Sequence, residues 1–238
     1  MKTIIHKANT RGHANHGWLE ANHSFSFASW FNPERIQFGA LRVLNDDRIA
    51  PGAGFPTHPH DNMEIITIPL SGTLEHKDSM GNVAQIKTGE VQVMSAGTGV
   101  THSEYNASDT EELKLFQIWI FPNAKNVEPR YDEVVLKDGE SKNRLQQLVS
   151  PSPDDAGTWI HQDAYLYITD IDNQSGAFTY QLKSEENGVY TMVISGDAVI
   201  AENSLGKRDA IGISNVNGFK YSTKHSARIL FIEVPMNF

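Results

Sequence analysis

Apolar and polar residues alternate along most of this chain in short runs, and few stretches show the longer period of a helix. Because successive side chains of a strand point to opposite faces, such alternation predicts half-buried strands. Turns such as Pro51-Gly52 and Ser71-Gly72 bound most runs, a pattern typical of a β-sandwich or barrel. The predicted strands cover residues 37–44, 64–70, 91–94, 113–121, 165–171, 190–194 and 228–234.

One segment has a helical pattern. Residues 141–148 follow the Asp138-Gly139 turn, and Ser141 could cap the first turn of a helix there.

The order of turns and strands occurs twice. Ser71-Gly72 is followed by a short strand, two glycine turns and the strand at 113–120; Ser195-Gly196 is followed by a similar series that ends at 228–234. A repeated series indicates a duplicated unit. We therefore expect two similar β-barrels, joined within residues 122–145.

Composition narrows the classes of protein. The chain has 238 residues, no cysteine and a formal charge of −9, from 20 basic and 29 acidic residues. An acidic surface does not favour contact with phosphates, so direct nucleic-acid binding is not expected. Without cysteine, a metal site must use imidazole, carboxylate or water. We see no secretory signal and no membrane-spanning run, and expect a cytoplasmic protein.

Two short motifs carry the candidate chemistry. His58 and His60 lie two residues apart, as do His102 and Glu104. Residues two apart in a strand share a face, so each pair can aim both side chains at one point. A lone His-x-His often binds nothing, but two such pairs inside one barrel would offer three nitrogens and a carboxylate. That set suits Fe(II), Mn, Ni, Cu or Zn and leaves positions open for a substrate.

Around these residues the chain resembles the cupin superfamily. The first cupin motif matches Gly52, His58, His60, Glu64 and a late Gly72, and the second matches Gly89, Gly97, His102 and Asn106, with Ser95 in place of the usual proline. The sequences of residues 57–67, 74–82 and 94–104 resemble those of the pirin family, and parts of residues 11–28 resemble its N-terminal signature.

The resemblance implies an all-β bicupin of two antiparallel, jelly-roll-like β-barrels in tandem. Residues 1–133 would form the metal-binding barrel and residues 134–238 a barrel without metal. The family's metal ligands fall on His58, His60, His102 and Glu104. The second half has only His161 and His225, which agrees with a single site.

Glu64 is the ambiguous carboxylate. Its spacing from His58 and His60 would place it on their face if one strand ran through all three, and in many cupins this glutamate is a ligand. In pirins the Glu after the second-motif His has that role. We therefore predict Glu104 as the ligand and Glu64 as a structural carboxylate or a hydrogen-bond partner of a ligand.

The resemblance to bacterial pirins implies a quercetin 2,3-dioxygenase, an oxidoreductase that opens a flavonol with O2. One divalent metal is expected, with Fe(II) favoured over Mn, Ni, Cu, Co and Zn. It would lower the pKa of the flavonol hydroxyl, and Glu104 or Glu64 would take the proton. We expect a monomer. The alternative is a regulatory module that binds a protein partner; a cavity of a few hundred Å3 at Glu104 would favour the enzyme.

Three other groups of residues have weaker signals. His13, His16 and His23 are predicted to have surface or turn roles rather than to form another metal site. The aromatic residues between positions 18 and 38 could line a pocket, although core packing is the commoner role. The charged segment 75–78 is predicted to be a solvated hairpin end. The aromatics are Trp18, Phe25, Phe27, Trp30, Phe31 and Phe38.

Overall fold

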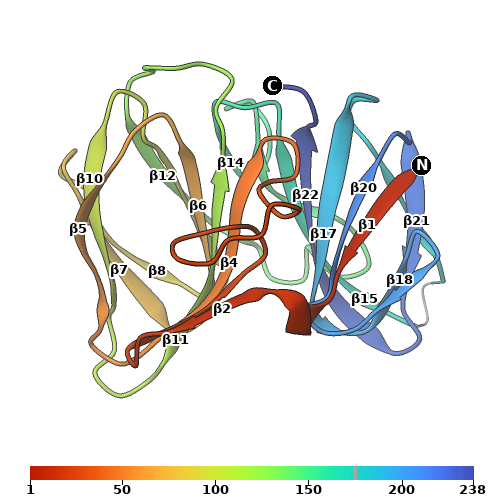
Figure 1. Cartoon of the computed structure of the whole chain (residues 1–238), viewed down its shortest axis with the longest axis horizontal. Coiled ribbons are helices and arrows are strands. Elements are labelled where there is room, and N and C mark those ends of the chain that lie inside the picture. The colour runs from red at the N-terminus through yellow and green to blue at the C-terminus, as the bar shows by residue number, and fades with distance from the viewer. Residues whose placement is uncertain (174–175) are drawn as a thin grey trace.

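The computed structural model describes residues 1–173 and 176–238, and nearly all of its regular structure is β (Figure 1). In that part of the chain the one helical element is the 3-10 turn η1 (Ala8–Thr10). Within the same residues, no helix has the length and apolar character needed to cross a membrane.

The strands fall into two halves (Figure 1). The first half contains β2 (Gly12–Asn15), β3 (Leu19–His23), β4 (Leu41–Ile49), β5 (Gly54–His60), β6 (Glu64–Ser71), β7 (Thr73–Asp78), β8 (Val83–Lys87), β9 (Glu90–Ser95), β10 (Val100–Asn106), β11 (Leu113–Ile120) and β12 (Arg130–Val135). The second contains β1 (Lys2–His6), β13 (Gln146–Ser150), β14 (Thr158–Trp159), β15 (Tyr165–Asp172), β16 (Phe178–Gln181), β17 (Asn187–Gly196), β18 (Ala198–Ile200), β19 (Asn203–Leu205), β20 (Ala210–Ser214), β21 (Gly218–Ser222) and β22 (Ser226–Pro235).

The two halves have the same arrangement of strands, except that the outer pair is antiparallel in the first half (β2 with β3) and parallel in the second (β14 with β13). The first combines a seven-stranded sheet, β12-β9-β6-β11-β4-β3-β2, with a four-stranded sheet, β5-β10-β7-β8. The second repeats this with β1-β20-β17-β22-β15-β13-β14 and β16-β21-β18-β19. The predicted duplication is confirmed, because Ser71 and Gly196 end the corresponding strands β6 and β17. Each half is cupin-type, but its sheets remain separate across the described strands, so the closed barrels of the prediction are not seen.

The first strand of the chain belongs to the sheet of the second half. β1, at the start of the chain, pairs antiparallel with β20 of the second half, while β12 pairs with β9 of the first. The predicted division after residue 133 falls within β12 and remains a prediction.

A shared apolar core joins the two seven-stranded sheets. It includes Ile66 and Phe116 from the first half and Leu166 and Leu230 from the second. At its edge the Arg208 guanidinium donates to Asp46, with Nε 2.8 Å from Oδ2. The first-half sheet therefore has one face buried against the second half and the other face directed into its own half.

Six of the seven predicted strands are confirmed over nearly their full length. The seventh begins only at Leu41 instead of residue 37. The predicted helix at 141–148 is wrong. Asn143 has a positive φ of 55°, and the Ser141 hydroxyl donates to Asp170 instead of capping a helix (2.6 Å). Residues from Gln146 onward form β13, because Leu148 and Val149 are buried in the shared core.

A buried histidine in β1 predicts a pH-dependent stability. His6 Nδ1 lies 2.9 Å from the Tyr190 hydroxyl. Burial, with a smaller effect of Arg35, lowers the pKa of His6 from 6.5 to about 4. The unfolded chain therefore binds this proton first, so the stabilisation is present above pH 6.5 and is lost as the pH falls towards 4. Over that interval the wild type should lose up to about 3 kcal/mol more stability than His6→Gln. Urea unfolding between these limits tests this, and parallel curves for the two proteins would contradict it.

Candidate metal centre

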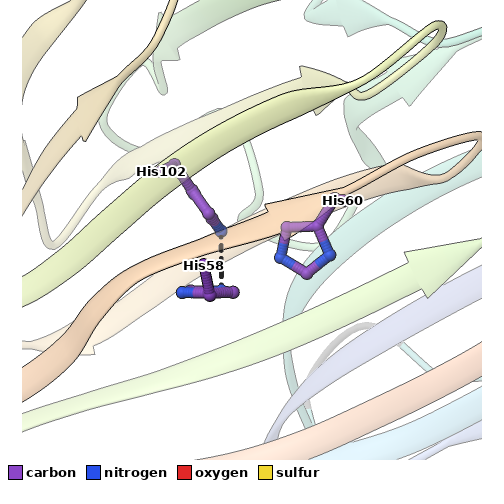
Figure 2. A group of neighbouring side chains, drawn as sticks. All are labelled: His58, His60 and His102. Carbon is purple, nitrogen blue, oxygen red and sulfur yellow. Dashed lines mark hydrogen bonds between the residues drawn. The ribbon is translucent and has the colours of Figure 1, made fainter.

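Three histidines converge from two paired strands of the first half. β5 and β10 run antiparallel, and His58 lies directly opposite His102. Figure 2 shows His58 and His60 projecting from one strand and His102 reaching towards them from the other. One nitrogen from each ring lies within 4.8 Å of the others, and the Nε2 atoms of His58 and His102 are 3.0 Å apart. The structure brings together the three imidazoles that the sequence motifs pointed to, and their role as metal ligands stays a prediction.

The protonation of these rings suits metal binding. Burial, reinforced by His58, lowers the pKa of His60 to about 4 and that of His102 to about 2, so both are neutral at pH 7. The Pro56 carbonyl accepts a hydrogen bond from His58 Nδ1 (2.8 Å), which leaves a lone pair on His58 Nε2. Neutral imidazoles whose nitrogens face one another fit a divalent transition ion.

Glu104 lies beside these histidines and is buried. Its carboxylate accepts hydrogen bonds from Gln117 Nε2 (2.9 and 3.2 Å) and from the Thr67 hydroxyl (3.3 Å). Burial raises the pKa of Glu104, and the Gln117 hydrogen bond opposes that effect. A carboxylate oxygen of Glu104 lies within 4.8 Å of nitrogens of His76 and His102. In the described residues, Glu104 therefore groups with His102 and His76, separately from the group of His58, His60 and His102, and its role as the fourth ligand stays a prediction.

Glu64 lies on the face of its sheet that packs against the second half, and not on the face that is directed towards the histidines. Asn62 has a positive φ of 45°, and residues 61–63 separate β5 from β6, so the alternation does not continue from His60. Within β6, Glu64 shares its face with Ile66 and Ile68 of the core between the halves. It accepts a hydrogen bond from the Ser95 hydroxyl (2.6 Å), and burial raises its pKa to about 7. These contacts favour the structural carboxylate among the predicted roles of Glu64 over a role as hydrogen-bond partner of a ligand or as base.

His76 is a buried residue that the sequence interpretation missed. Segment 75–78 was predicted to be a solvated hairpin end, yet the side chains of His76 and Asp78 are 0% exposed. The His76 ring stacks on Tyr131 of β12 (4.9 Å between centroids). The alternation of Leu74, His76 and Asp78 was the available signal, since Leu74 is apolar and would direct all three inward.

A cavity of about 380 Å3 opens at this centre and includes His58, His60 and Glu104 in its wall. Phe27, Phe55 and Trp119 line it as well. Trp119 contacts both His60 (5.0 Å between centroids) and Phe27 (5.3 Å). The arrangement places a largely apolar space next to the histidines.

Four of the six N-terminal aromatics take one of the two predicted roles, whereas Phe31 is exposed. Phe25 and Phe38 are buried in the shared core, as the commoner interpretation predicts. Phe27 lines the cavity, and Trp18 packs edge-on against the cavity residue Phe55 (5.2 Å).

Two further polar residues of the cavity were not recognised. His13 and His16 are exposed, as predicted, but His23 is buried and its Nδ1 lies 2.9 Å from Asn45 Oδ1. Asp47 also lines the cavity; burial, followed by the charges of Asp46 and Glu104, raises its pKa well above the usual value. No motif marks either residue, because their role depends on which face of β3 and β4 is turned inward.

The equivalent strands of the second half have different chemistry. β16 and β21, which correspond to β5 and β10, contribute Tyr180, Phe219 and Tyr221 to an aromatic core. Tyr180 donates its hydroxyl proton to the buried Glu233 (2.8 Å). Where the first half gathers imidazoles, the second half is filled by packed rings.

Comparison with known proteins adds independent evidence. The family model for pirin matches residues 5–120, and the model for the quercetinase C-terminal cupin domain matches residues 147–234. A protein of Escherichia coli strain K12 named quercetin 2,3-dioxygenase is 42% identical over 233 residues, which cover 97% of this chain and 98% of that protein. A pirin-like protein of Caulobacter vibrioides is 37% identical and covers 93% of this chain and 95% of its own length.

Solved structures agree in fold. The crystal structure of YhhW from Escherichia coli is 40% identical and covers 98% of both chains with a TM-score of 0.93. A structure of the same bacterial pirin in complex with nickel(II) covers 98% of this chain and 99% of that chain, with a TM-score of 0.92 at 40% identity. The match extends over essentially the whole chain, and this chain belongs to the pirin family.

Proposed function

We propose that this protein is a metal-dependent dioxygenase that cleaves flavonols such as quercetin with O2. His58, His60, His102 and Glu104 would hold one divalent transition ion in the first half of the chain. The observation that carries the proposal is the cavity of about 380 Å3, because it brings His58, His60 and Glu104 to a space a small molecule can enter. Relatives named quercetin 2,3-dioxygenase support this substrate class, and the nickel(II) complex of a relative supports a divalent ion.

The cavity walls bind and orient the substrate. Phe27, Phe55 and Trp119 offer ring surfaces to a flat aromatic molecule and exclude water from the histidines. The volume lies near the lower end of the range for small-molecule pockets, about 300–1,000 Å3, which favours one compact ligand.

Glu104 is the proposed proton acceptor. When bound, the divalent ion would act as a Lewis acid that lowers the pKa of the flavonol hydroxyl. Glu104 is buried in the wall of the cavity, so its carboxylate is placed to accept that proton from a bound substrate. The Gln117 amide, 2.9 Å from Oε2, holds this carboxylate towards the cavity.

Metal reconstitution tests the proposed activity. The protein is stripped with a chelator, reloaded separately with Fe(II), Mn, Ni, Cu, Co or Zn, and mixed with quercetin in air. We expect at least one ion to restore the loss of quercetin absorbance, with one O2 consumed per quercetin. Binding of one equivalent of metal without turnover for any ion would overturn the dioxygenase and leave the regulatory module as the better explanation.

A further inference from the structure

Two buried ring nitrogens near the metal centre have no hydrogen-bond partner in the described residues. They are His102 Nδ1 and His76 Nδ1. The two ring centroids are 5.3 Å apart. The pairing of β10 with β7 sets this proximity, because His102 lies opposite Asp78 and Glu104 lies opposite His76. A buried polar atom left unpaired is destabilising, so a second state of the site is expected to use these nitrogens.

The hydrogen bonds of the histidines define which nitrogens carry protons. His58 uses its Nδ1 proton for the Pro56 carbonyl, so in the 3.0 Å contact with His102 the proton belongs to His102 Nε2. A metal ligand must offer a lone pair. Binding an ion through His102 Nε2 therefore moves the ring proton to Nδ1, where it needs an acceptor.

His76 is prepared to be that acceptor. Its Nε2 lies 3.2 Å from Asp78 Oδ2. Asp78 also accepts hydrogen bonds from the backbone N–H of Met80 (2.9 Å) and Asn82 (3.0 Å) and from the Asn82 side chain (2.9 Å). A carboxylate with this many donors acts only as an acceptor, so His76 Nε2 carries a proton, and in the neutral ring Nδ1 then offers a lone pair. The Tyr131 ring holds His76 in this orientation by stacking.

We propose that Asp78 and His76 are positioning residues that fix the metal-binding tautomer of His102. Asp78 accepts from His76 Nε2–H, and His76 Nδ1 accepts from His102 Nδ1–H, directly or through one buried water. The chain of groups makes His102 a better ligand and sets its ring orientation. This inference rests on the metal centre of the proposed function but does not depend on the substrate.

The test measures nickel(II) affinity by competition with a chelator of known affinity. His76→Phe keeps a ring against Tyr131 and removes the acceptor, and should weaken binding about 10- to 100-fold. His76→Gln restores an acceptor oxygen and should recover most of that loss. The matched control is Glu75→Gln on the same strand, whose carboxylate pairs with the partly exposed Lys77 instead (2.7 Å) and should leave affinity unchanged.

A second readout separates positioning from a purely structural role. In the zinc-loaded protein, nitrogen-15 NMR of the imidazoles should show a protected proton on His102 Nδ1, and this proton should be lost or exchange rapidly in His76→Phe. Thermal melting of the metal-free variants checks that they fold. A folded His76→Phe that binds nickel as tightly as the wild type, or that keeps the protected proton, would overturn the inference. Wild-type protein that binds no metal would overturn the centre itself, whereas binding without quercetin turnover would overturn only the proposed reaction.

Discussion

Replacing His102 by alanine should abolish metal retention and quercetin turnover together. His102 is 1% exposed, and its Nε2 faces His58 at 3.0 Å, so it is the most enclosed of the three converging imidazoles. Loss of a residue that only supports a ligand costs about 10- to 100-fold in metal affinity, and loss of the ligand itself should cost more than about 100-fold. Metal content after dialysis and the rate of quercetin loss measure both effects.

The matched control for this prediction is His225→Ala. His225 is an exposed histidine of the second half, so its replacement by alanine removes the same imidazole at a position outside the metal centre. It should leave metal content and turnover at the wild-type level. Full metal retention by a folded His102→Ala protein would contradict the assignment of His102 as a ligand.

The sequence predicted those parts of the centre that depend on spacing within one strand. His58 and His60 lie two residues apart in β5, and His102 and Glu104 lie two apart in β10, so alternation alone places each pair on one face. The strands themselves were predictable for the same reason, since each has a continuous buried face.

The sequence did not predict what depends on breaks and on pairing between strands. Glu64 has the correct spacing from His60, but the turn at Asn62 intervenes and β6 restarts with Glu64 on the opposite face. His76 lies among charged residues, and only the register of β7 with β10 brings it behind His102. Asp47 reaches the cavity through the order of strands in the sheet, which local patterns do not encode.

The segment that was wrongly predicted to be a helix, residues 141–148, also depends on contacts between strands. Its local pattern was helical, yet pairing of β13 with β15 and burial of Leu148 against the other half stabilise a strand. Helix propensity contributes only tenths of a kcal/mol per residue, whereas a fully buried leucine contributes about 1.5–3 kcal/mol. Tertiary contacts therefore decide the conformation of this segment.

The two halves share one arrangement of strands, but only the first half has histidines at the positions of the candidate metal centre. The corresponding strands of the second half have aromatic residues there. A metal centre needs inward polar groups, each of which must be paired or ligated because burial without a partner is costly. The second half avoids that cost by placing Tyr180, Phe219 and Tyr221 where the first half has imidazoles. Its packed interior supports the shared core, and the first half can retain a cavity.

Glu104→Gln should lower quercetin turnover by about 10²- to 10⁴-fold while the protein remains folded. Glutamine has nearly the same shape as glutamate, so packing beside Thr67 and Gln117 is kept, but an amide can neither take a proton nor offer a charged oxygen to a cation. The loss should appear mainly in kcat, because the aromatic walls that bind the substrate are unchanged. Steady-state rates and metal content, measured on the same reloaded samples, separate loss of the proton acceptor from loss of the ion.

Glu64→Gln makes the same carboxyl-to-amide change on the opposite face of the first half. Glu64 contacts the Ser95 hydroxyl and not the cavity, so this variant should turn over quercetin at close to the wild-type rate. Urea unfolding of this variant and the wild type measures any change in stability, which would report on the core between the halves. Turnover that is lost in Glu64→Gln and kept in Glu104→Gln would reverse the assignment of the proton acceptor.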